Sequence, residues 1–300
     1  MMDENKVYSD EELLELAKNG ESDAYIMLGL RIYHDSTEAS RKAIEYYKKA
    51  ADMGNVEAMA CVAIHLQYCN TAENIAVCNK YAKMGYDRGN KESSIVYLLH
   101  MARGIGMEPD PHTAKKELKR LAKGGDAEIL TELGRLYLDE TVAKPDVKKG
   151  IKLLTEAAEQ NYESAEYELG RLYLDGRLVE QDLKKSMYYL DRAQAHGLAS
   201  LVDEDIAEVF SQSGDIDSQI KTLEHGMNNG NEEACLELIE IYKKGISGKS
   251  YKKKAFEVAL AGAKMGYPYA MCMVGDMYEE GKGTEVNLTE ALRWYRMAAA

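Results

Sequence analysis

Cys61, His65 and Cys69 are the residues whose types and spacing most resemble a reactive or metal-binding set. A spacing of four residues places all three along one face of a helix, and Cys78 follows in the next segment. Cysteines with a histidine can hold zinc, and two cysteines can form a redox pair. Cysteine is also among the residue types most often buried without a chemical role, so core packing is the competing interpretation.

Other catalytic motifs are weak or absent in the sequence. The Gly104–Gly106 stretch has no preceding strand-like run and no following Gly-Lys-Ser/Thr, so it does not indicate a phosphate-binding loop. No Gly-x-Ser-x-Gly elbow occurs. The acidic pairs are typical of a solvated surface, because 51 of the 300 residues are acidic. We therefore expect no enzyme, with a hydrolase-type or metal-dependent module centred on Cys61, His65 and Cys69 as the alternative.

The elements that carry these residues repeat with a period near 36 residues. The segment LGRLYLDET from Leu133 returns as LGRLYLDGR from Leu169. Small residues that tolerate left-handed helix ends recur at spacings of 35, 36, 36, 36, 33 and 36, at Gly54, Gly89, Gly125, Asn161, Gly197, Gly230 and Gly266. A fixed period of this length indicates an array of stacked supersecondary units.

Each unit is expected to form two helices. Apolar residues recur at one-face helical spacing in the first segment of a unit, as at Ala165, Leu169, Leu172 and Tyr173. A glycine recurs in the middle of this helix, at Gly29, Gly134, Gly170 and Gly275. Because such a glycine costs about 1 kcal/mol relative to alanine, we expect a neighbouring helix to approach closely there. Residue types typical of an N-cap precede the second helix, at Asp110, Asp146, Asp182, Asp215 and Asn287.

The pattern A-x3-LG-x2-Y, a loop, and A-x2-(W/Y)Y-x2-AA-x2-G resembles the Sel-one-like repeat, a relative of the tetratricopeptide repeat. Residues 270–299 carry it best, through Ala270, Val274-Gly275, Tyr278, Ala291, Trp294-Tyr295 and Ala298-Ala299. Units two, three and six depart from it, with Val62-Ala63, Tyr97-Leu98 and Asp205-Ile206 in place of LG. The resemblance implies an all-α, right-handed superhelical solenoid of about eight two-helix repeats.

The expected repeats cover residues 24–57, 58–92, 93–128, 129–164, 165–200, 201–233, 234–269 and 270–300, as one solenoid. Residues 9–20 are expected to form an N-terminal capping helix, and residues 1–8 to be disordered. The last helix stops at Ala300, two residues before the expected glycine, and no polar capping helix follows. We expect the natural chain or another copy to cover this end, which would permit end-to-end contact.

The repeat frame favours packing over metal binding at the first cluster. His65 takes the place of Leu136 and Leu172, and Cys78 takes the place of Ala43, all expected core positions. No cofactor is expected.

By analogy with tetratricopeptide arrays, the first helix of each unit lines a concave groove. The residues expected there are Tyr33, His34, Gln67, Tyr68, Arg135, Tyr167, Arg171 and Phe210. Exposed aromatic and arginine side chains are enriched at interface hot spots. Arg135 and Arg171 lie one unit apart on the same row, where they could clamp an acidic group. The sequence predicts a non-catalytic scaffold or adaptor that binds a protein or peptide segment, and the resemblance implies the same role, mostly in bacteria.

Composition limits the partners further. The net charge of −13 argues against binding to nucleic acid or anionic membranes. No run approaches the roughly 18 apolar residues of a membrane span, so no membrane insertion is expected. Five unevenly spaced cysteines and no visible secretory signal indicate reduced thiols in the cytoplasm.

Overall fold

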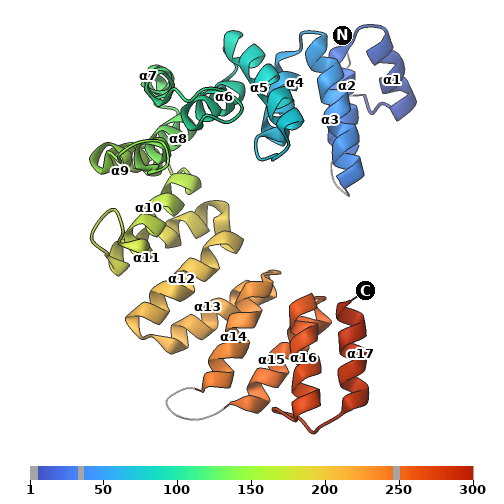
Figure 1. The fold of residues 1–300 in the computed structure, drawn as a ribbon, viewed down its shortest axis with the longest axis vertical. Coiled ribbons are helices and arrows are strands. Elements are labelled where there is room, and N and C mark those ends of the chain that lie inside the picture. The colour runs from blue at the N-terminus through green and yellow to red at the C-terminus, as the bar shows by residue number, and fades with distance from the viewer. Residues whose placement is uncertain (1–5, 33–36, 246–250, 300) are drawn as a thin grey trace. The chain divides into compact units, whose positions relative to one another are not determined.

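The computed structural model describes residues 6–32, 37–245 and 251–299, and every regular element in those ranges is helical (Figure 1). The α-helices are α1 (Asp10–Lys18), α2 (Ser22–Ile32), α3 (Thr37–Asp52), α4 (Val56–Leu66), α5 (Ala72–Asp87), α6 (Lys91–Arg103), α7 (Pro111–Leu121), α8 (Ala127–Leu138), α9 (Val147–Ala158), α10 (Glu163–Asp175), α11 (Leu183–Ala193), α12 (Ala199–Ser213), α13 (Ile216–Asn228), α14 (Glu232–Lys244), α15 (Lys252–Lys264), α16 (Pro268–Glu280) and α17 (Leu288–Ala298). A short 3-10 turn, η1 (Ala122–Gly124), follows α7, and a π-helical turn, η2 (Gln194–Leu198), follows α11.

The helices pack in consecutive pairs, which confirms the all-α fold class. The chain divides into two compact units, Met1–Asp146 and Val147–Ala300. In the first unit α2 packs on α3, α4 on α5 and α6 on α7. In the second unit α10 packs on α11, α12 on α13, α14 on α15 and α16 on α17. The first helices of neighbouring repeats also touch, at α4 and α6, α6 and α8, α10 and α12, and α12 and α14.

The predicted helix ends are confirmed by the backbone angles. All seven residues of the glycine and asparagine series have a positive φ, from 59° at Asn161 to 127° at Gly197. N-cap carboxylate or amide oxygens accept a backbone hydrogen bond at four of the five predicted positions, namely Asp110, Asp182, Asp215 and Asn287. The chain therefore ends one helix and starts the next at residues set by the repeat.

The predicted close approach at the mid-helix glycines is confirmed at three positions. A Cβ added to Gly29 or Gly275 would collide with the ring of Tyr47 or Tyr295, and one added to Gly170 would lie 2.7 Å from Leu190 Cγ. In these three pairs the second helix rests directly on the glycine of the first.

The N-terminal segment packs on the first repeat. Ser9 caps α1 in a reciprocal hydrogen-bonded box with Glu12. Tyr8 is buried in one apolar cluster with Leu13 and Leu28. Residues 1–5 of the stretch expected to be disordered lie outside the described residues.

Candidate functional site

The cluster of Cys61, His65, Cys69 and Cys78 is placed by α4, its C-terminal turn and α5. The Cys78 thiol is fully buried and donates to the Ala63 carbonyl oxygen at 3.4 Å. His65 Nδ1 lies 2.6 Å from the Cys61 carbonyl oxygen. Among the residues that the structure describes, no group of three His, Cys, Asp or Glu side chains could hold a metal ion.

Burial favours the neutral form of two thiols of this cluster, Cys61 and Cys78. Burial raises the pKa of Cys78 to about 12, and burial with nearby Glu57 raises the pKa of Cys61. Since the thiolate is the form that attacks electrophiles, burial disfavours nucleophilic attack by these two cysteines. The described residues thus show no metal site at Cys61, His65 and Cys69, the centre of the alternative interpretation.

Three sequence-predicted groove residues, Gln67, Tyr68 and Arg135, lie together in one cleft of the first unit. This first cleft, of about 460 Å³, opens over α4, α6 and α8. Its lining residues are Ile64, Gln67, Tyr68, Glu92, Ile95, Val96, Leu99, His100, Arg103, Ile105, Glu128, Glu132 and Arg135. Tyr68 is 86% exposed, so its ring is available to a partner. Arg135 forms an ion pair with Glu132, so it is not a free cation.

His100 is a buried polar group of the first cleft that the sequence did not single out. Its Nδ1 lies 2.7 Å from Asn79 Oδ1, and its Nε2 lies 3.3 Å from the Gln67 carbonyl oxygen. Asn79 Nδ2 donates to the Ile105 carbonyl oxygen at 2.8 Å. Burial, together with nearby Arg103, lowers the pKa of His100. These bonds fix the Gly104–Gly106 loop region against α4 and α5.

Tyr167 and Arg171 lie together in a second cleft, within the second unit. This second cleft, of about 660 Å³, opens over α10, α12 and α14. Its lining residues are Tyr167, Arg171, Glu204, Asp205, Glu208, Ser211, Glu233, Leu236, Glu237 and Glu240. Arg171 stands 5.9 Å from the Tyr167 ring centroid, and its Nε lies 3.6 Å from Asp205 Oδ1. Asp205 occupies one of the positions where the sequence departs from the repeat pattern.

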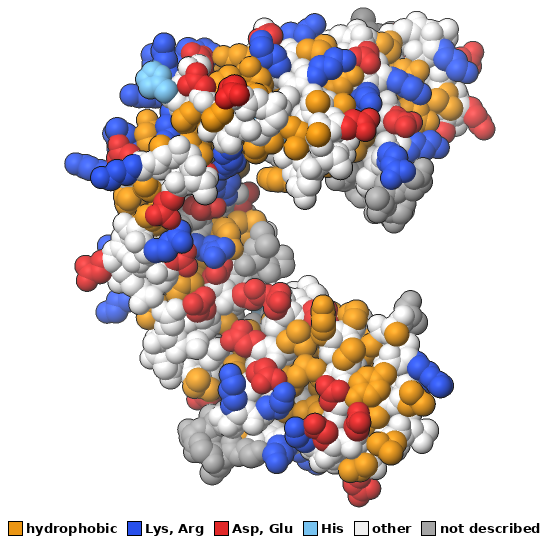
Figure 2. Space-filling model, viewed as in Figure 1, with side chains coloured by type: hydrophobic (Ala, Val, Ile, Leu, Met, Phe, Trp, Pro, Cys, Tyr) orange, Lys and Arg blue, Asp and Glu red, His pale blue; other side chains and the backbone are white. Residues whose placement is uncertain are grey.

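The second cleft is strongly acidic, because six carboxylates and a single arginine line it. Three of the carboxylates accept hydrogen bonds from uncharged amides: Glu204 from Asn231, Glu208 from Gln212, and Glu237 from Gln219, each at 2.9 Å. Burial raises the pKa of Asp205 and of Glu237, and nearby carboxylates add to both effects. The negative charges of this cleft are therefore only partly compensated within the chain. Carboxylates gather over the region of α12 and α14 in Figure 2.

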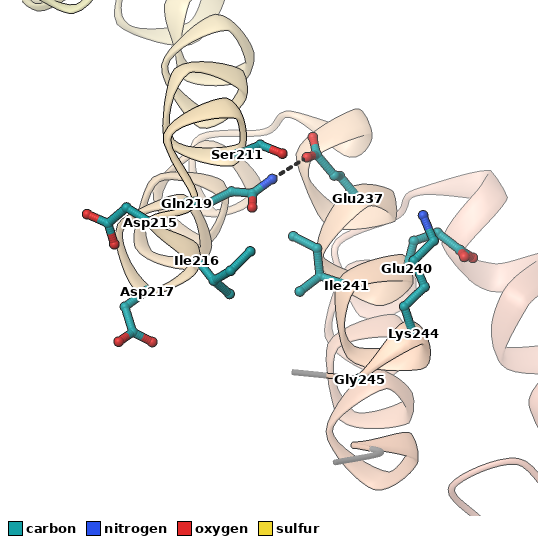
Figure 3. A pocket seen from close by; sticks show the side chains of 11 residues that line it. Ser211, Asp215, Ile216, Asp217, Gln219, Glu237, Glu240, Ile241, Lys244 and Gly245 are labelled. Carbon is teal, nitrogen blue, oxygen red and sulfur yellow. Dashed lines mark hydrogen bonds between the residues drawn. The ribbon is translucent and has the colours of Figure 1, made fainter. Parts of the chain in front are cut away.

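A hollow of about 590 Å³ adjoins the second cleft and shares Ser211, Glu237 and Glu240 with it. Figure 3 shows Ile216 and Ile241 side by side in this hollow, below the Gln219–Glu237 hydrogen bond. The cleft and hollow together offer carboxylates beside apolar side chains.

The remaining predicted groove residues are not brought to these clefts. Tyr33 and His34 lie outside the described residues. Phe210 lines a separate hollow of about 290 Å³ with Asp203 and His225. Arg135 and Arg171, expected to act as a clamp, belong to different units, and each pairs with a carboxylate of its own unit.

Glu166 is another buried polar residue that the sequence did not indicate. The side chain is 0% exposed on α10, and its carboxylate lies 2.7 Å from both Arg192 Nη2 and His196 Nδ1. Arg192 belongs to α11 and His196 to η2, so this network ties α10 to the kink before α12. Because the Glu166 carboxylate is fully buried, we interpret this network as a structural contact between helices rather than a binding site.

Stacked helix pairs whose first helices open onto shared clefts define a helical repeat protein. Four stretches, residues 22–55, 128–162, 163–198 and 268–300, match the family model described as Sel1 repeat. The chain therefore contains four Sel1 repeats.

Two solved structures share the fold. A Sel1 repeat protein from Oxalobacter formigenes is 20% identical, with a TM-score of 0.53, over 100% of this chain and 93% of that chain. The protective antigen c5321 of uropathogenic Escherichia coli strains, which displays an SLR fold, is 17% identical with a TM-score of 0.54. That alignment covers 97% of this chain but 63% of the antigen. No curated protein matches the chain significantly. None of the helices among the described residues is long and apolar enough to cross a membrane.

Proposed function

We propose that this protein is a non-catalytic interaction scaffold whose clefts hold segments of a partner protein. The observation that carries the proposal is that three successive first helices line one cleft in each unit: α4, α6 and α8 in the first, and α10, α12 and α14 in the second. Sel1 repeats are generally protein-interaction modules. A row of rigid helices offers an extended chain several contact points in sequence.

The second cleft binds a segment rich in lysine and arginine. Glu204, Glu208 and Glu237 accept hydrogen bonds from uncharged amides, so cations from a partner would meet under-compensated carboxylates. Leu236 and Tyr167 in the cleft, with Ile216 and Ile241 in the adjoining hollow, offer apolar contact to the aliphatic stems of such side chains. We expect no nucleic acid to bind at this cleft, because its phosphates would be repelled by the carboxylates.

The first cleft contributes an apolar contact. Ile95, Val96 and Leu99 are buried at its base, and the exposed Tyr68 stands at its edge. Aromatic residues of this kind act as interface anchors.

The free cysteines further support a reducing, cytoplasm-like compartment as the place of action.

The test of the second cleft is the binding of fluorescein-labelled octalysine, measured by fluorescence anisotropy. The probe variant is Glu204→Gln/Glu208→Gln/Glu237→Gln. Each exposed or half-exposed ion pair contributes up to about 0.5 kcal/mol, so three together give about 1.5 kcal/mol, or about tenfold in Kd. We also expect the affinity of the wild-type protein to fall as salt rises.

A control variant matched in charge is Glu156→Gln/Glu159→Gln/Glu285→Gln, whose side chains are exposed outside the cleft. It should bind octalysine within about twofold of the wild type. Equal losses in both variants would show that only net charge matters. No loss in the probe variant would refute the second cleft as the binding site.

A further inference from the structure

Arg171 is the only cation among the described residues that line the second cleft. It lies on α10 one helical turn after Tyr167, and its guanidinium carbon is 5.9 Å from the centroid of the Tyr167 ring. Asp205 approaches from α12, and its Oδ1 atom lies 3.6 Å from Arg171 Nε. The ring and the carboxylate therefore flank one position in the cleft, and the chain's own arginine lies beside both. We call this position the Tyr167–Asp205 subsite.

The Tyr167–Asp205 subsite has the chemistry of a guanidinium site. An aromatic ring attracts a cation that lies within about 6 Å of its centroid, and a planar guanidinium can stack on the ring while its N–H groups face a carboxylate. The Asp205 side chain is only 14% exposed. Burial raises the pKa of Asp205, and nearby Arg171 acts in the opposite direction. A cation beside Asp205 therefore favours its charged form.

Arg171 is held loosely in this subsite. Its side chain is 49% exposed, and the 3.6 Å between its Nε and Asp205 Oδ1 is longer than a hydrogen bond. Arg192 of α11 shows how the second unit holds a structural arginine, because its Nη2 lies 2.7 Å from the Glu166 carboxylate and donates to the Ala158 carbonyl oxygen at 2.7 Å. Since exposed ion pairs contribute little to stability, Arg171 can leave Asp205 at small cost.

A second carboxylate is within reach of Arg171 when it leaves the subsite. Asp175 follows it by four residues on α10, which is a spacing at which oppositely charged side chains pair on a helix. Asp175 is exposed, and its charge already acts on Arg171. Arg171 therefore has two alternative partners, Asp205 within the second cleft and Asp175 outside the residues that line it.

We propose that Arg171 is a built-in competitor that occupies a guanidinium subsite formed by Tyr167 and Asp205. An arginine of the partner segment displaces it toward Asp175. This inference rests on the proposed binding of a basic segment in the second cleft and adds a preference to it. Lysine is a compact, strongly hydrated cation that stacks on an aromatic ring less well than arginine. The Tyr167–Asp205 subsite thus selects arginine over lysine at one position of the segment, and Arg171 limits the affinity of the cleft.

Fluorescence anisotropy with two labelled peptides of equal length and charge, octalysine and octaarginine, tests the competitor. The readout is the ratio of their Kd values, because a change in net charge alone shifts both affinities together. Arg171→Gln should strengthen octalysine binding by about two- to threefold through the lost repulsion, and octaarginine binding by about three- to tenfold more than that. The control Arg177→Gln removes an exposed arginine outside the lining residues of the cleft, and should leave the ratio within about twofold of the wild type. Far-UV circular dichroism checks that each variant is folded.

A second substitution assigns the gain to the subsite. In the Arg171→Gln background, either Asp205→Asn or Tyr167→Leu should return the Kd ratio to near its wild-type value. The inference is overturned if Arg171→Gln strengthens the two peptides equally or not at all, or if the change in ratio survives Asp205→Asn. In those outcomes the wild type still binds octalysine, so the proposed scaffold function stands. A wild type that binds neither peptide refutes the proposed function of the second cleft, and this inference with it.

Discussion

Replacing Gly29 with alanine should destabilise the first unit, although alanine is the better helix former. The added Cβ would lie 2.8 Å from Tyr47 Cζ and 2.9 Å from Tyr47 Cδ1. Tyr47 is fully buried, and its ring centroid is 5.2 Å from that of His65, so the ring has little room to move. Overpacking of this kind costs about 1–3 kcal/mol, and the gain in helix propensity returns about 1 kcal/mol. We expect a net loss of about 1 kcal/mol.

Gly124→Ala is the matched control in the same unit. A Cβ at Gly124 would have no atom within 4 Å, and the backbone there is not in the left-handed region. Alanine at this position should raise the free energy of unfolding by about 0.4–1 kcal/mol, because it reduces the conformational entropy of the unfolded chain. The two glycine-to-alanine changes should therefore differ by about 2 kcal/mol, with opposite signs.

Urea unfolding followed by far-UV circular dichroism measures this difference, and amide exchange in α2 and α3 assigns it to the first unit. The fluorescence of Trp294, the single tryptophan of the chain, reports on the second unit and should not change. In a Tyr47→Leu background the cost of Gly29→Ala should shrink, because the ring is gone. Stabilisation by Gly29→Ala equal to that by Gly124→Ala would refute the reasoning from close packing.

Three further outcomes follow from the second unit and the thiols. Arg192→Ala removes an ion-pair partner of the buried Glu166 carboxylate and should lower the free energy of unfolding by about 3 kcal/mol. Urea unfolding followed by Trp294 fluorescence measures this change. A decrease below about 1 kcal/mol would contradict the burial of this charge. The pKa of Glu237 in the folded state lies above its ordinary value of 4.5. At pH values between the two, the native state therefore binds more protons than the unfolded state. The free energy of unfolding consequently falls as the pH rises through that window. Unfolding measured from about pH 4 to 7 should show this slope, and Glu237→Gln should flatten it; an unchanged slope would refute the assignment. Iodoacetamide should modify the exposed Cys272 in the native protein, whereas the buried Cys78 should react only after unfolding. Peptide mass spectrometry identifies the modified cysteines. Modification of Cys78 in the native protein would contradict its burial.

The fold was accessible from the sequence because helix termination is a local property. Gly54 and Asn161, for example, sit in left-handed conformations that few other residue types adopt, and their period alone locates the helix ends. The prediction of close approach at Gly29 and Gly170 worked for a similar reason, since a recurring cost must be offset by a recurring contact. Both inferences needed only the chain's own spacing.

The candidate site was less accessible, because side chains from different repeats share it. Tyr167 and Arg171 were found on α10 by their place in the repeat, yet the carboxylates of α12 and α14 were dismissed as ordinary surface charge. Phe210 was assigned to the same groove, but it lies in another hollow with Asp203. The acidic cleft could have been found by mapping the charged residues onto the first helices of successive repeats. The total charge of the chain does not reveal where the carboxylates gather.

Most residues that line the second cleft lie where the sequence departs from the repeat pattern. The family model matches residues 163–198 and 268–300 but passes over the segment between them, which contains α12 and α14. These two helices supply eight of the ten lining residues of the second cleft. A repeat position must satisfy packing against its neighbours, so a conforming repeat has fewer positions free to vary. At one position where the pattern has its leucine-glycine pair, α12 instead carries Asp205, and that carboxylate faces Arg171 across the cleft. The regular repeats thus supply the packing framework, and the divergent repeats supply most of the charge of the second cleft, which would select the partner of the proposed scaffold.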